Sequence, residues 1–89
     1  MTLVRLRGPL KTLAGDCAEH DLDGASVADL LRELELRHPP LRGWIVDERG
    51  HIRRHINVFI NGERGREATA VAAEDRIDVI PAISGGGWA

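Results

Sequence analysis

The stretch that decides the fold is Arg54-His55-Ile56-Asn57-Val58-Phe59-Ile60-Asn61-Gly62. Side chains of two kinds alternate along it, with Ile56, Val58 and Ile60 on one face and His55, Asn57 and Phe59 on the other. This period of two predicts a β-strand over residues 54–60. Asn61-Gly62 then predicts a tight hairpin turn, because both residues tolerate a positive φ. A weak return strand is expected at 63–67.

The same alternation predicts three further strands. The first covers residues 3–7, with Val4 and Leu6 on one face, and Gly8-Pro9 breaks it. The second is short and covers residues 17–22. The last covers residues 76–80. A short helical turn is expected at 70–74, just before the last strand.

One helix is predicted between the second and third strands. Ser26 is a favourable N-cap, and Asp29 follows three residues later, where a carboxylate suits the positive helix end. Val27, Leu30, Leu31 and Leu34 then recur at helical spacing on one face. Pro39-Pro40 prevents continuation, so the helix should end near Arg37 or His38. Trp44 and Ile45, in the irregular stretch that follows, are expected at the edge of the core.

The order of elements is strand, strand, helix, strand, weak strand, strand. A single helix of this kind must bury its apolar stripe against one face of one sheet. The predicted fold class is therefore α+β: a β-grasp, or ubiquitin-like, fold with one mixed sheet and a single main helix packed across it. The first and last strands are expected side by side.

Composition excludes several classes of function. With 89 residues the chain forms one small domain, and its formal net charge of −2 argues against nucleic acid as a partner. No apolar run is long enough for a signal peptide or a membrane span, so we expect a cytoplasmic protein. The single cysteine, Cys17, fits a reducing compartment and is expected to be a small packing residue. The four histidines lack metal-ligand spacing, so no metal site is predicted.

The most unusual feature is the glycine run that follows the last strand. Gly85, Gly86 and Gly87 come directly after Ile77–Ser84. Residues without a Cβ let an extended chain thread where no side chain would fit. This is the geometry needed if a backbone carboxylate is itself the reacting group. We therefore predict a β-grasp domain over 1–83 and a flexible glycine-rich tail over 84–89.

Two motifs together resemble the ThiS/MoaD family of ubiquitin-like sulfur carriers. They are Ile56-Asn57-Val58-Phe59-Ile60-Asn61-Gly62-Glu63 and, after a spacer, Asp75-Arg76-Ile77-Asp78-Val79-Ile80-Pro81-Ala82-Ile83-Ser84-Gly85-Gly86. The longer connection between helix and third strand resembles the MoaD branch and the cysteine-biosynthetic carriers. With the element order, the resemblance covers nearly the whole chain.

The resemblance implies a carrier or cosubstrate rather than an enzyme. A partner adenylyltransferase of the ubiquitin-activating type would adenylate the carboxylate of Gly86 with Mg-ATP, and a sulfur donor would displace AMP. The resulting thiocarboxylate would pass its sulfur to a partner synthase that makes cysteine, molybdopterin or a similar metabolite. No cofactor is expected on the chain itself, since ATP and Mg belong to the activating enzyme. Adenylation makes the carbonyl attackable by giving it a good leaving group.

The sequence departs from the simplest family pattern after Gly86. Gly87, Trp88 and Ala89 follow it, and an internal glycine cannot carry a thiocarboxylate. We expect a protease, of the zinc metalloprotease type in similar carriers, to remove this extension, which blocks premature adenylation by the bulk of Trp88. The run of three glycines leaves Gly87 open as the mature terminus. The alternative is an inert tail that is never trimmed.

Phe59 is the only phenylalanine and lies on the predicted strand face away from the helix. Such a face resembles the partner-docking surface of ubiquitin-like domains, and we predict partner binding by Phe59, Ile80, Ala82 and Ile83. The competing interpretation places Phe59 in a second minor core under the long loop. Three alternatives to the sulfur carrier remain: a ubiquitin-like protein modifier, the small subunit of a molybdopterin-synthase-like complex, and a binding module with an idle tail.

Overall fold

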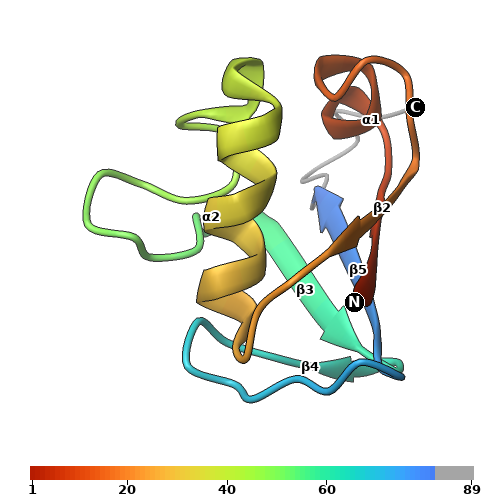
Figure 1. The fold of residues 1–89 in the computed structure, drawn as a ribbon. Helices are drawn as coiled ribbons and strands as arrows, with labels where there is room; N and C mark the ends of the chain where they lie inside the picture. Colours follow the sequence, from red (N-terminus) through yellow and green to blue (C-terminus); the bar gives the residue numbers. More distant parts are fainter. Residues whose placement is uncertain (82–89) are drawn as a thin grey trace.

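The structure, a computed structural model, describes residues 1–81. It contains one five-stranded sheet with the strand order β2-β1-β5-β3-β4 and one main helix, α2, across one face (Figure 1). The elements in chain order are β1 (Thr2–Leu6), α1 (Pro9–Leu13), β2 (Glu19–Leu22), α2 (Val27–Arg37), the 3-10 helix η1 (Pro39–Leu41), β3 (Ile56–Ile60), β4 (Glu63–Arg64) and β5 (Arg76–Pro81). This is the predicted mixed sheet with a single main helix, the β-grasp arrangement.

The first and last strands lie side by side and parallel, as expected. Leu3 pairs with Arg76 and Leu6 with Val79, whereas β1–β2, β3–β4 and β3–β5 are antiparallel pairs. β5 therefore occupies the centre of the sheet, with a strand on each side. β5 is paired on both sides over residues 77–79, and residues 80–81 are paired with β3 alone.

The core lies between the sheet and α2. Every second residue of β1, β3 and β5 enters it, and α2 contributes its predicted apolar stripe; the fully or almost fully buried members include Val4, Leu6, Ile56, Val58, Ile77, Val79, Val27, Leu30, Leu31 and Leu34. Ile60 is half-buried and packs against this cluster. Ile45 of the long loop is completely buried, while Trp44 beside it is 45% exposed, so only Ile45 closes the core.

The helix begins and ends where the sequence predicts. The Ser26 hydroxyl accepts a hydrogen bond from the Asp29 amide at 3.3 Å, and the Asp29 carboxylate reaches back to the amide of Ala25. Two further amides at the helix start, those of Val27 and Ala28, donate to carbonyls of residues 69 and 67. These four contacts satisfy donors that have no partner inside the helix. The helix ends at Arg37, before Pro39-Pro40.

Several local predictions are wrong. The return strand is only Glu63–Arg64: one more hydrogen bond, from the Gly65 amide to the Val58 carbonyl at 2.8 Å, follows it, and the chain then leaves the sheet toward the helix start, where the carbonyls of residues 67 and 69 accept from α2 amides. The turn expected at 70–74 is shorter than predicted: Ala70 bridges Ser26 in an antiparallel manner and the Val71 amide donates to the Ala25 carbonyl, so only a single turn, closed by the Asp75 amide on the Ala72 carbonyl at 3.0 Å, precedes β5. The amides at the start of α2 need hydrogen-bond acceptors, which the carbonyls of residues 67 and 69 supply, and this requirement outweighs the weak helix preference of the local sequence.

Two features near the N-terminus also differ from expectation. The second strand begins at Glu19, so Cys17 lies outside it and is exposed rather than packed; its thiol donates to the Glu19 carbonyl. The unforeseen helix α1 follows Gly8, whose φ of 61° allows the chain to turn, and it starts with Pro9, the residue that suits a first helical position. α1 exists because Leu10 is fully buried and Leu13 packs against the core.

Candidate functional site: the end of the central strand and the open sheet face

The candidate site begins where β5 ends. Pro81, the last described residue, is paired with Ile56, the first residue of β3. β1 has already ended at Leu6, opposite Val79, because the chain turns at Gly8 into α1. The end of β5 is thus flanked by β3 alone. The predicted tail residues Gly85, Gly86, Gly87, Trp88 and Ala89, as well as Ala82 and Ile83, lie outside the described residues.

The face of the sheet opposite α2 carries the other predicted site residues. Phe59 and Ile80 are half-buried there, and their register makes them diagonal neighbours: Phe59 pairs with Asp78, and Ile80 lies two residues further along β5. Within residues 1–81, neither side chain belongs to the core cluster or packs against it. Phe59 and Ile80 therefore lie outside the main core described for residues 1–81, and docking or a separate minor core remain the two interpretations of Phe59.

A charged group lies between the apolar residues on this open face. The Asp78 carboxylate has the Arg5 guanidinium at 3.7 Å on one side and that of Arg76 at 3.4 Å on the other. The Asp78 side chain is only 13% exposed, although no helix covers it. Arg5 also approaches Glu19 of β2 at 3.8 Å. An enclosed carboxylate without a cationic partner would destabilise the fold, so Arg5 and Arg76 compensate the charge of Asp78.

This charged group was not predicted from the sequence, although alternating charges mark the outward positions of both strands. Arg5, Asp78 and Arg76 occupy outward positions of the first and last strands, and their opposite charges meet only because those strands are neighbours. Asn61 was also underestimated. Besides supplying the hairpin turn with a φ of 52°, its side chain donates to the Asp75 carboxylate and accepts from the Arg76 amide, both at 2.9 Å. Asn61 thereby fastens the hairpin to the start of β5.

The described residues hold no arrangement typical of a metal site or a membrane segment. No group of three or more histidine, cysteine, aspartate or glutamate side chains within residues 1–81 is placed to hold a metal ion. No helix in the same range is long and apolar enough to cross a membrane. What the described part of the site presents is the end of a central strand beside an open, mixed apolar and charged face.

Comparison with known proteins identifies the family. Residues 4–86 match the ThiS family, which covers almost the entire chain. The chain belongs to the ThiS family. A relative of known sequence, small archaeal modifier protein 1 of Haloferax volcanii, is 40% identical over 67 residues, covering 74% of this chain and 77% of that protein.

Solved structures of this family share the fold throughout. The crystal structure of SAMP1 from Haloferax volcanii superposes with a TM-score of 0.81 at 35% identity, covering 96% of this chain and 98% of the other. A chain of the Amycolatopsis orientalis BexX/CysO complex superposes with a TM-score of 0.87 at 28% identity, covering 97% and 100%. The family comprises ubiquitin-like small modifiers and sulfur carriers, so the predicted fold and family are both confirmed.

Proposed function

We propose that this protein is a sulfur carrier whose reacting group is the carboxylate of Gly86. The observation that carries the proposal is the family match, which extends into the three glycines and ends at Gly86. The pairing of β5 supports it, because β3 holds the strand as far as Pro81 and so fixes the place in the sheet where the tail begins.

The proposed chemistry has two balanced steps. The Gly86 carboxylate oxygen attacks the α-phosphorus of ATP, pyrophosphate leaves, and an acyl adenylate forms. A sulfide-level donor then attacks the acyl carbon, AMP leaves, and a thiocarboxylate remains. ATP and Mg are bound by an activating enzyme of the adenylyltransferase type. Gly85 and Gly86 contribute the absence of side chains, which lets the backbone approach closely.

The proposal includes processing and docking. Gly87-Trp88-Ala89 follow Gly86, so a protease, proposed to be a zinc metalloprotease, removes them before activation. Phe59 and Ile80, with Ala82 and Ile83 beyond the described residues, contact the activating enzyme and the sulfur-accepting synthase. The half-buried pair Phe59 and Ile80, on the sheet face that α2 does not cover and near the end of β5, supports this assignment, since apolar groups on an uncovered face favour interaction sites. The accepting pathway is proposed to be cysteine or molybdopterin biosynthesis, or a similar one.

The experiment is an intact-mass measurement. Variants ending at Gly86, Gly87 and Ser84, together with the full chain, are each incubated with the activating enzyme of the same cell, Mg-ATP and sulfide. The form ending at Gly86 is expected to exchange one oxygen for one sulfur, whereas the full chain and the Ser84 form are not. If only the form ending at Gly87 exchanges oxygen for sulfur, the mature C-terminus is Gly87 instead of Gly86. Absence of exchange on both glycine forms refutes the sulfur-carrier function.

A second function is supported by the relative that is named a small modifier protein at 40% identity. The same activated glycine would acylate a lysine amine instead of a sulfur donor, giving an isopeptide bond. Digests of cellular protein should then contain lysines that carry the tail ending in Gly86 or Gly87. A stable complex with one large subunit would instead favour the role of a small subunit in a molybdopterin-synthase-like enzyme.

A further inference from the structure

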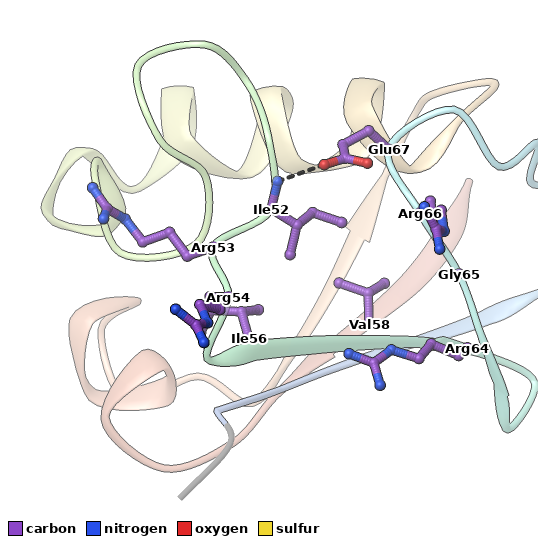
Figure 2. Close-up of a pocket in the computed structure, with 9 residues that line it drawn as sticks. All are labelled: Ile52, Arg53, Arg54, Ile56, Val58, Arg64, Gly65, Arg66 and Glu67. Atoms are coloured by element: carbon purple, nitrogen blue, oxygen red, sulfur yellow. Dashed lines mark hydrogen bonds between the residues drawn. The ribbon is translucent and has the colours of Figure 1, made fainter. Parts of the chain in front are cut away.

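A hollow lies at the β3–β4 edge of the molecule, on the opposite side of the sheet order from β2. Its volume is about 790 Å³, and it is bordered by residues 52–54 on one side and 64–67 on the other (Figure 2). Four arginines line it: Arg53, Arg54, Arg64 and Arg66. The floor is the aliphatic edge of β3, formed by Ile56 and Val58. We call this hollow the arginine groove.

The groove exists because β4 is so short. Beyond Arg64, only the hydrogen bond from Gly65 to the Val58 carbonyl continues the pairing with β3. The chain then departs toward α2, and its Glu67 carboxylate reaches across to the Ile52 amide at 2.7 Å (Figure 2). This bond closes one end of the groove and leaves the rest open. Ile56 and Val58 are 3% and 1% exposed, so the floor is formed by core residues.

The charge of the groove is strongly positive in a chain that is negative overall. Its lining contains four arginines and one carboxylate, against a formal net charge of −2 for the whole protein. Hydrogen bonds from the backbone amides of Glu67 itself and Ile52 lower the pKa of that carboxylate, so it is ionised but already engaged by the backbone.

The four arginines also have no carboxylate partner among residues 1–81. In the part of the chain that the structure describes, ion pairs within 4 Å are formed by Arg5, Arg32, Arg37 and Arg76, and by none of the four groove arginines. Figure 2 shows the Arg64 side chain extended along β3, whereas Arg53 points outward at the far end of the groove. Unpaired guanidinium groups gathered around one hollow favour an anionic occupant.

We propose that the arginine groove docks an extended acidic segment of a protein partner. The arginines come from both borders of the hollow, Arg53 and Arg54 on one and Arg64 and Arg66 on the other, so an extended segment with several carboxylates can pair with both borders, whereas an isolated phosphate cannot. The overall negative charge disfavours nucleic acid. Ile56 is also the residue paired with Pro81, so the groove borders the exit of the tail. The identification of the partner as the activating enzyme rests on the proposed function. The preference of the groove for an acidic segment is independent of that function.

The first test is a titration followed by amide resonances of the full chain. The probe is a capped eight-residue peptide with glutamate at alternate positions and valine or threonine between, and the control replaces each glutamate by glutamine. The acidic peptide is expected to shift the amides of Ile56, Val58 and Gly65, with at least tenfold weaker binding at high salt. Arg64→Glu should weaken binding at least tenfold. Arg7→Glu, the same charge change at an exposed site beside β1, should leave it unchanged.

Several outcomes would overturn the inference. The inference fails if both peptides bind equally, if other amides shift, or if Arg64→Glu and Arg7→Glu behave alike. Tighter binding of inorganic pyrophosphate at the same amides would make the groove a small-anion site. Concentration-dependent shifts of these amides without peptide would assign it to a second copy of the chain. Circular dichroism of each variant confirms that it is folded.

The second test uses the activating enzyme and separates this inference from the proposed function. With wild-type chain trimmed to Gly86, adenylation itself reports on the proposed function. Given adenylation, Arg64→Glu and Arg66→Glu should raise the KM for the carrier at least tenfold with little change in kcat, and Arg7→Glu should change neither. Unchanged KM in both groove variants refutes docking on that enzyme. If no adenylation occurs at all, the peptide titration alone decides.

Discussion

Replacing Gly65 by alanine should test how closely the chain must approach β3 to form the wall of the groove. A Cβ built at Gly65 would lie 2.5 Å from Cδ1 and 3.2 Å from Cγ1 of Ile60. Overpacking of this kind costs about 1–3 kcal/mol, and the lower end applies because Ile60 is half-buried and Cδ1 is the end of its side chain. Removing a glycine returns about 0.4–1 kcal/mol by restricting the unfolded chain. The steric cost of about 1 kcal/mol is thus partly offset, and we expect Gly65→Ala to destabilise the protein by about 0.5 kcal/mol at most.

A second substitution makes this reasoning specific. Ile60→Val deletes the clashing Cδ1 and, at a half-buried site, should alone cost about 0.5 kcal/mol. If the clash is the cause, the double variant should be no less stable than Ile60→Val, so the coupling between the two sites is about 1 kcal/mol. The assay is urea unfolding followed by circular dichroism, with free energies from linear extrapolation.

Gly62→Ala provides the matched control. A Cβ there meets nothing within 4 Å, but the φ of 89° strains any other residue. Its cost, about 1 kcal/mol, comes from the backbone and should simply add to that of Ile60→Val. If the costs of Gly65→Ala and Ile60→Val also add, to within about 0.5 kcal/mol, in the double variant, the proposed steric contact between the two residues is refuted.

Three further predictions concern pH and docking. Burial raises the pKa of Glu35, and Arg42 lowers it by a smaller amount, so ionisation of this carboxyl group opposes folding. Glu35→Gln should therefore become more stable than wild type as pH rises through the pKa of Glu35, and the two should be equally stable in acid. Urea unfolding at pH 4 and pH 7 measures the difference. A hydrogen bond from the Ala72 amide lowers the pKa of Asp75, so Asp75→Asn should be less stable than wild type at pH 7, and the gap should close as pH falls through the folded-state pKa. Phe59→Ala should raise the KM for adenylation at least tenfold at unchanged kcat, and an unchanged KM would remove Phe59 from the docking surface.

The sequence alone was sufficient for the features that depend on neighbours along the chain. The alternation in residues 56–60, the positive-φ pair Asn61-Gly62 and the Ser26 cap each place the required chemistry within a few residues, and the structure has all three. The family could be identified for a related reason: its motifs are a strand, a turn and a glycine run, which are local patterns.

The tertiary structure decided everything that depends on distant partners. The carbonyls of residues 67 and 69 lie beside the start of α2 because its amides need acceptors, and α1 forms because Leu10 has a core to enter. Asp78 is held by Arg5 only because β1 and β5 are neighbours in the sheet. The arginine groove likewise joins residues 52–54 to 64–67 across β3. Such contacts are set by the closure of long loops around a shared core, and no short window of sequence contains both partners.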